Sequence, residues 1–212
     1  SGTDAVLPGK GEGMVIESAA RPGFALWFTG LPSSGKTTVA EMTCGMLSER
    51  GVTAVVLNSA RLRKVLTPRP LYTDEERDWF YGVLVYLAEH LTESGVNVAI
   101  CATAPRRYYR ATARLHIEKF AEVFVDCPES VCRSRDPKGL WRKADRGEIR
   151  SLPGAGVLYE KPTLPEIHIQ TARSSVADSA CEVLRGIEAL GFIDRARRGV
   201  RKRSSDGKVI FL

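Results

Sequence analysis

The 212-residue sequence lacks the features that mark membrane, secreted and metal-binding proteins. Its longest apolar runs fall far short of the roughly 20 residues that a membrane-spanning helix needs. No charged segment followed by an apolar one opens the chain, so no secretion signal is predicted. The five cysteines form no Cys-x-x-Cys pair, and the three histidines are widely spaced. We therefore predict a reduced, cytoplasmic protein without a membrane segment or a cysteine–histidine metal site.

Net charge gives little support for a nucleic-acid-binding protein. The chain carries a formal charge of +6, but six basic residues and no acidic ones lie in residues 195–203. The other 25 basic residues equal the 25 acidic ones. We predict a basic tail over residues 193–212 that is solvated, with an interaction arm as the alternative. No helix-turn-helix, zinc-finger or aromatic RNA-binding signature accompanies it, so no specific nucleic-acid partner is expected.

Apolar runs and amphipathic segments alternate along the middle of the chain. Residues 1–22 are rich in Gly and Pro and predict a flexible leader. Buried strands are predicted at 24–30, 52–58, 96–103, 121–128 and 165–171. Helices are predicted at 36–51, 73–95, 106–120 and 175–191, with a short one through Val131 and Cys132. This order predicts one three-layer α/β domain over residues 23–192, with a mainly parallel sheet of about five strands.

A phosphate-binding loop lies between the first strand and the first helix. The stretch "GLPSSGKTT" fits the pattern Gly, four residues, Gly, Lys, Ser/Thr, which is typical of P-loop NTPases. Its glycines let backbone N–H groups face a phosphate chain, its lysine reaches the β- and γ-phosphates, and the hydroxyl of Thr37 suits Mg²⁺. The predicted ATP-binding residues are Gly30, Leu31, Pro32, Ser33, Ser34, Gly35, Lys36, Thr37 and Thr38.

A long basic segment interrupts the alternation of strands and helices. Residues 136–162 contain Pro, Gly and many basic residues without a clean period. A compact P-loop domain with such a segment before its last strand indicates a small-molecule kinase whose lid closes on the transferring phosphate. The predicted catalytic cations are Lys36, Arg135 and Lys138. The alternative for this segment is a solvated basic helix face.

Four segments together resemble the adenylylsulfate (APS) kinases. They are "GLPSSGKTT", "TDEER" at the start of the long helix, "EVFVDCPESVCRSRDPKGLWRKADRGEI" and "YEKPTLPEI", and the resemblance covers roughly residues 24–190. It implies that ATP and Mg²⁺ are used to transfer the γ-phosphate to the ribose 3′-hydroxyl of APS. It also implies a cytoplasmic homodimer with a nucleotide as its small-molecule substrate.

The acceptor side departs from the family pattern. The family has Asp-Gly-Asp after its second strand, where this chain has Asn58, Ser59 and Ala60, so both acids are missing. The Asn and Arg that follow on the family's long helix fall on Phe80 and Gly82. The resemblance implies acceptor binding by Arg63, Tyr72, Arg77, Arg107, Lys143 and Leu152, with Tyr72 and Leu152 at the places of two base-stacking aromatics.

Three hypotheses remain open on sequence grounds. The chain is a kinase for APS, a kinase for another hydroxyl-bearing metabolite, or a nucleotide-binding regulatory domain without turnover. Transfer tolerates the loss of a base, because phosphoryl transfer depends mostly on positioning and charge neutralisation. Asp74, Asp126 and Asp136 are the remaining candidates for a carboxylate near the phosphates, and a structural role for Asp126 is the alternative.

Overall fold

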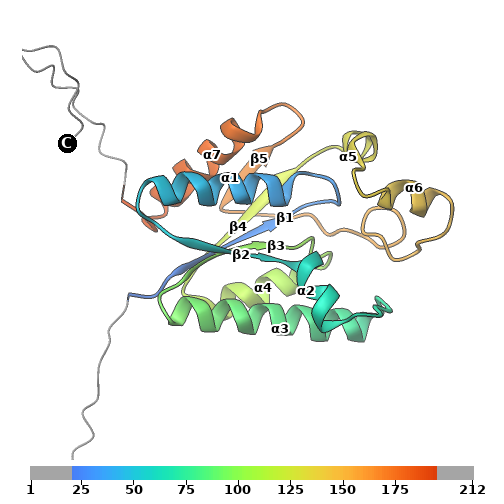
Figure 1. The fold of residues 1–212 in the computed structure, drawn as a ribbon, viewed down its shortest axis with the longest axis horizontal. Helices are drawn as coiled ribbons and strands as arrows, with labels where there is room; N and C mark the ends of the chain where they lie inside the picture. The colour runs from blue at the N-terminus through green and yellow to red at the C-terminus, as the bar shows by residue number, and fades with distance from the viewer. Residues whose placement is uncertain (1–20, 195–212) are drawn as a thin grey trace, which may run out of the picture.

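The computed structural model describes residues 21–194, and these form a five-stranded parallel sheet between two layers of helices (Figure 1). The strands are β1 (Phe24–Thr29), β2 (Ala54–Asn58), β3 (Asn97–Cys101), β4 (Lys119–Asp126) and β5 (Ile167–Gln170). The helices are α1 (Lys36–Glu49), α2 (Ser59–Leu66), α3 (Asp74–Glu93), α4 (Arg107–His116), α5 (Glu129–Arg135), α6 (Leu140–Asp145) and α7 (Val176–Ala189). The predicted fold class is therefore confirmed.

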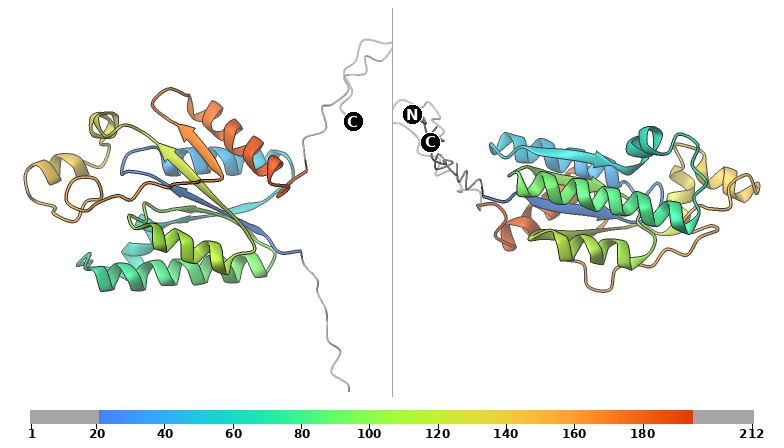
Figure 2. Two further views of the ribbon diagram at one scale, coloured as in Figure 1. Left: turned by 180° about the vertical axis from the view of Figure 1, so that it is seen from behind. Right: turned by 90° about the horizontal axis from the view of Figure 1, so that it is seen from below.

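The strand order β2-β3-β1-β4-β5 places β1 at the centre of the sheet. Every residue of β1 is buried, which explains its continuous apolar sequence. Helices α1 and α7 cover one face of the sheet, and α3 and α4 cover the other (Figures 1 and 2). Two apolar clusters fill the layers, one around Phe28 and Leu47 and the other around Trp27 and Phe80. The fold thus brings the carboxyl ends of all strands to one edge, next to α5 and α6 (Figure 2).

Polar side chains define where the long helices begin. Thr73 accepts a hydrogen bond from the backbone N–H of Glu76 at the start of α3, and Ser175 accepts one from Asp178 at the start of α7. Three acidic residues occupy the first turn of α3, where they interact favourably with the helix dipole. No described helix has the length and apolarity that a membrane crossing requires.

Three local predictions need correction. Two helices, α2 and α6, were not predicted, because each is shorter than ten residues and gives too little periodicity to detect. The helix predicted over 106–120 ends at His116, because Lys119 already pairs with Phe24 as the first residue of β4. The predicted leader and basic tail lie almost entirely outside the described residues.

Candidate active site

The phosphate loop joins β1 to α1 with a backbone shape that depends on glycine. Gly30 has φ 149° and Gly35 has φ 97°, both outside the range that other residues readily adopt. A Cβ atom on Gly30 would lie 2.5 Å from the carbonyl oxygen of Val125 on the neighbouring strand. Gly35 directly precedes the first turn of the 14-residue α1, so backbone N–H groups at this helix end are available to a phosphate.

The side chain of Lys36 is bound to the backbone of the phosphate loop. Its Nζ donates to the carbonyl oxygens of Gly30, at 2.9 Å, and Leu31, at 2.7 Å. Burial lowers the pKa of Lys36 to about 8, and the charge of Lys138 acts in the same direction. The lysine is therefore a cation at neutral pH. Its Nζ can exchange these two carbonyl oxygens for the oxygens of a bound phosphate.

Thr37 and Asn58 form a direct link between the phosphate loop and the end of β2. The Nδ2 of Asn58 donates to the Thr37 hydroxyl at 3.0 Å. The Oδ1 of the same side chain accepts from the N–H groups of Ala60 and Arg61 and so caps α2. The cap fixes which end of the amide faces Thr37. One lone pair of the Thr37 oxygen stays available to a cation, so this residue fits an Mg²⁺ ion that is also bound by phosphate oxygens.

Two side chains outside the sequence motif support the loop. The indole N–H of Trp141 donates to the carbonyl of Pro32 at 3.2 Å. The Thr171 hydroxyl donates to the carbonyl of Ser34 at 2.7 Å. Arg135 donates in turn to the carbonyl of Thr171 at 2.6 Å, which places this predicted cation beside the loop. Trp141 and Thr171 were missed because each contacts the loop from a segment far away in the sequence, although Trp141 lies within a segment that resembles the family.

The basic segment contains a small buried core that packs on the phosphate loop. Trp141 and Leu152 are buried with the thiol groups of Cys127 and Cys132, and Leu31 of the loop packs against this cluster. The backbone of Gly154 approaches so closely that a Cβ there would lie 2.8 Å from both Leu31 and Trp141. The predicted lid is therefore not wholly irregular, since α6 and this lid cluster give it a fixed interior.

Acidic neighbours neutralise part of the lid's basic charge. Arg133 pairs with Glu129 and Asp145, Arg142 lies 3.6 Å from Asp136, and Arg146 pairs with Glu148. In the part of the chain that the structure describes, four lid cations join no such pair: Lys138, Lys143, Arg150 and Lys161. Lys138 and Lys143, which were predicted from the sequence, are thus among the lid cations that can accept a new anionic partner.

On the opposite side of the loop, Arg63 lies in an aromatic pocket. Its guanidinium carbon is 3.8 Å from the centre of the Phe80 ring, 5.1 Å from that of Tyr72 and 5.9 Å from that of Tyr81. Both terminal nitrogens of Arg63 are buried without a well-formed hydrogen bond among residues 21–194, although the guanidinium interacts with the hydroxyl of Tyr81. A buried guanidinium with unsatisfied donors is well suited to bind an anionic group.

Arg77, on α3, lies beside Tyr72 and links the aromatic pocket to the lid. Arg77 is buried and donates to the carbonyls of Tyr72, at 3.2 Å, and Ser151, at 2.7 Å. Its guanidinium carbon lies 5.5 Å from the centre of the Tyr72 ring. The half-exposed Tyr72 offers a face for stacking, whereas the side chain of Leu152 is buried in the lid cluster. Arg107 begins α4 at the same edge of the sheet, and its backbone N–H donates to Glu160.

The three remaining candidate carboxylates all have structural partners. Asp74 forms an ion pair with Arg106. Asp126, at the end of β4, lies 3.2 Å from the Nε2 of His168. Asp136 accepts from the backbone N–H of Arg142 at the start of α6, and such backbone bonds lower its pKa although desolvation opposes them.

A pocket of about 490 Å³ opens between the phosphate loop and the lid. It is lined by Leu31 of the loop, Glu129 of α5, residues 154–159 of the lid and Lys161. This pocket, the phosphate loop and the aromatic pocket around Arg63 lie along the edge of the sheet where the parallel strands end, which is where such sheets bind ligands.

The model of the adenylylsulphate kinase family matches residues 22–170. The chain belongs to this family. It is 37% identical to a probable adenylyl-sulfate kinase from Pyrococcus abyssi over 171 residues, covering 81% of this chain and 98% of that protein. It is also 37% identical to an adenylyl-sulfate kinase from Rippkaea orientalis over 171 residues, covering 81% of this chain and 94% of that protein.

A solved structure shows the same arrangement of elements. The APS kinase CysC of Mycobacterium tuberculosis, solved with AMPPNP and APS, superposes with a TM-score of 0.74 at 35% identity. The alignment covers 79% of this chain and 98% of that one. The predicted family, fold and class of ATP-dependent kinase are therefore confirmed. The roles of individual residues remain predictions.

Proposed function

We propose that this APS kinase family member transfers the γ-phosphate of ATP to the 3′-hydroxyl of adenylyl sulfate. The observation that carries the proposal is the placement of two cationic sites on one edge of the sheet. The phosphate loop with Lys36 lies on one side, and the aromatic pocket with the unsatisfied guanidinium of Arg63 lies on the other. The first fits the triphosphate of ATP, and the second fits an acceptor that carries its own anion.

Each half of the site has a defined task. Lys36 and the N–H groups of the loop hold the β- and γ-phosphates, and Thr37 takes part in holding Mg²⁺. When bound, Mg²⁺ supplies positive charge to the β- and γ-oxygens. Arg135 at the end of α5 and Lys138 in the lid act on the transferring group, while Arg63 and Arg77 hold the acceptor. The further acceptor-binding residues in this proposal are Tyr72, Arg107, Lys143 and Leu152.

The transfer itself needs little covalent help from the protein. The acceptor oxygen bonds to the γ-phosphorus, the bond from that phosphorus to the β,γ-bridging oxygen breaks, and ADP leaves. The hydroxyl proton passes to a phosphoryl oxygen or to water, since Asn58 and Ala60 offer no carboxylate. A general base contributes about 10²–10⁴-fold in rate, so its absence slows this reaction without abolishing it.

A coupled ADP-release assay tests this proposal. ATP, Mg²⁺ and the protein are combined with adenylyl sulfate or with other hydroxyl-bearing acceptors. We expect ADP release to be stimulated by adenylyl sulfate. Stimulation only by another acceptor would instead mean that the aromatic pocket around Arg63 binds a different substrate.

A second candidate function is supported by one observation. Asn58 donates a hydrogen bond to Thr37 in the place where the family pattern has a carboxylate, which removes negative charge from the cation site. A nucleotide-binding regulatory domain without turnover is consistent with this change. Binding of an ATP analogue with no ADP release for any acceptor would favour it.

We further propose a cytoplasmic homodimer, on the basis of the family resemblance. Sedimentation of the full chain at several protein concentrations measures its oligomeric state. A mass of about 47 kDa, twice the 23.3 kDa of one chain, is the expected result. A mass that stays near 23.3 kDa at all concentrations would contradict it.

A further inference from the structure

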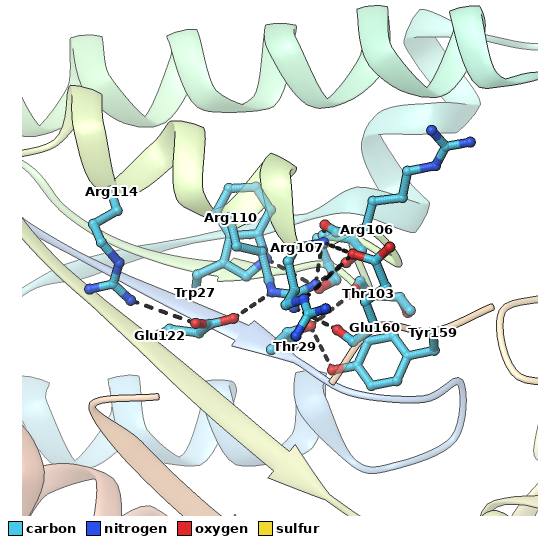
Figure 3. A network of polar contacts seen from close by, with 12 residues as sticks. Trp27, Thr29, Thr103, Arg106, Arg107, Arg110, Arg114, Glu122, Tyr159 and Glu160 are labelled. Atoms are coloured by element: carbon cyan, nitrogen blue, oxygen red, sulfur yellow. Dashed lines mark hydrogen bonds and ion pairs between the residues drawn. The ribbon is translucent and has the colours of Figure 1, made fainter. Parts of the chain in front are cut away.

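A buried arginine outside both nucleotide sites connects the segments that surround the acceptor. Arg110 lies in the first half of α4 and only 2% of its surface is exposed. Its Nε donates to the carboxylate of Glu122 on β4, which balances the buried charge. Figure 3 shows Arg110 at the centre of the network, with Glu122 on one side and the Tyr159–Glu160 segment on the other.

The remaining donors of Arg110 reach backbone carbonyls on two separate segments. One terminal nitrogen donates to the carbonyl of Ala104, and lies 3.3 Å from that of Arg106, on the loop between β3 and α4. The other donates to the carbonyl of Glu160, at 2.7 Å, where the chain returns from the lid. The guanidinium donates from three nitrogens spread over its plane, whereas the three N–H donors of a lysine all leave a single nitrogen and cannot span the same separation.

The loop held by Arg110 includes a strained residue. Ala104 has φ 42°, a conformation that side chains other than glycine rarely adopt. Its N–H donates to the hydroxyl of Tyr81, at 3.1 Å, and its carbonyl accepts from Arg110. The strain is therefore held from both sides, and Tyr81 is part of the aromatic pocket around Arg63.

The two segments also bind each other and the phosphate-loop strand. The N–H of Glu160 donates to the carbonyl of Pro105 at 2.8 Å, and the N–H of Arg107 donates to the Glu160 carboxylate at 2.7 Å. The Tyr159 hydroxyl lies 3.0 Å from that of Thr29, the last residue before the phosphate loop. The end of the lid is thus fixed to the loop that carries Arg107 and to the strand that carries the phosphate loop.

We propose that Arg110 is a positioning residue, which holds the Ala104–Arg107 loop and the Tyr159–Glu160 segment together so that the acceptor meets a preformed surface. The inference rests on the proposed function, because the acceptor side is assigned there. In this arrangement residues 159–160 are the fixed end of the lid, and any closing movement takes place in the residues before them. A 1 Å displacement of the loop would misplace Arg107 and weaken acceptor binding while leaving the ATP site unchanged.

The main test variant is the double substitution Arg110→Met with Glu122→Leu. It replaces the buried ion pair with apolar side chains of similar volume and leaves no unpaired buried charge. Such replacements are often tolerated. Arg110→Lys is the conservative variant, since it keeps the ion pair but cannot reach all three carbonyls. Arg114→Met is the matched control, because Arg114 lies one turn further along α4 and pairs with Glu122 and Glu166 without touching either segment.

Two readouts decide the proposal. Hydrogen exchange on the free protein should speed up by about tenfold or more at the amides of Ala104, Arg107 and Glu160 in the double variant. With adenylyl sulfate as acceptor, its KM should rise by about tenfold or more while the Kd of ATP changes by less than about twofold. Arg110→Lys should show the same KM defect to a smaller degree, and Arg114→Met should show neither change.

Three outcomes count against the account, each in a different way. Unchanged exchange at the three amides would overturn the proposal, because the segments would not depend on Arg110. Faster exchange with an unchanged acceptor KM would also overturn it, leaving a purely structural role. If the parent protein shows no response to adenylyl sulfate, the proposed function fails, and the exchange comparison alone then decides whether Arg110 holds the two segments.

Discussion

The buried Lys36 predicts a specific pH dependence of ATP binding. Burial lowers its pKa to about 8 in the free protein. The lysine is therefore about 90% protonated at pH 7 and about 10% protonated at pH 9. Only the protonated form attracts the β- and γ-phosphates, and the terminal phosphate of ATP is already ionised above about pH 7. The affinity for ATP should thus be constant below pH 7.5 and fall by up to about tenfold per pH unit above pH 8.

The same argument predicts proton uptake on binding. A bound triphosphate raises the pKa of Lys36 towards its ordinary value, so about half a proton should be taken up at pH 8. Isothermal titration calorimetry with a non-hydrolysable ATP analogue, in two buffers of different ionisation enthalpy, measures affinity and uptake together. Lys36→Arg is the control, since its guanidinium stays charged throughout and should remove the pH dependence between pH 7 and 9.5.

ATP affinity falls as the pH rises, whereas the contribution of Lys36 to folding stability should increase. Because the folded pKa of Lys36 is below 10.5, the unfolded chain binds more protons between about pH 8 and 10.5. The contribution of Lys36 to stability therefore increases across that window. An ATP affinity that stays flat from pH 7 to 9.5 in the parent protein would refute the assignment of Lys36 as a buried, titrating phosphate ligand.

Three further predictions concern the acceptor side and the lid. Restoring both acids, by Asn58→Asp with Ala60→Asp, should raise turnover with adenylyl sulfate by about 10–10³-fold, because a proton acceptor returns to the site; no gain in a folded, ATP-binding variant would show that acceptor recognition has changed as well. Limited proteolysis should nick residues 136–162 in the free protein and do so more slowly with an ATP analogue plus acceptor. Equal cleavage with and without ligands would contradict a closing lid. Trp141→Ala should destabilise the domain by about 3–5 kcal/mol in denaturant unfolding, whereas the half-exposed Trp79→Ala should change it by about 0.5 kcal/mol or less; similar losses for both would contradict a packed lid cluster.

Much of the fold could be predicted from the sequence because its signals are local. The apolar run that forms β1 ends at the glycine of the phosphate loop, and Thr73 with three acids marks the start of α3. Such signals depend on neighbouring residues alone. Helices α2 and α6 escaped prediction because each is shorter than ten residues and so gives too little periodicity to detect.

The site could be predicted only where a motif carries it. The phosphate loop could be proposed from its motif, because the spacing of that motif follows from the geometry of a phosphate chain. Trp141 and Thr171 hold residues 109 and 137 positions away, and Arg110 holds Glu160, 50 positions away. All three contacts are made to backbone carbonyls, which leave no mark in a sequence pattern. The burial of Leu152 in the lid cluster likewise depends on packing that periodicity does not reveal.

The most direct test of the central claim is to follow the phosphate itself. The full chain is incubated with Mg²⁺, adenylyl sulfate and ATP labelled in its γ-phosphate, and the nucleotides are then separated and analysed by phosphorus NMR. The account predicts that the label appears on the 3′-oxygen of adenylyl sulfate in a one-to-one ratio with ADP. Label found only in ATP, or only in inorganic phosphate, after prolonged incubation of folded protein that binds ATP would contradict it.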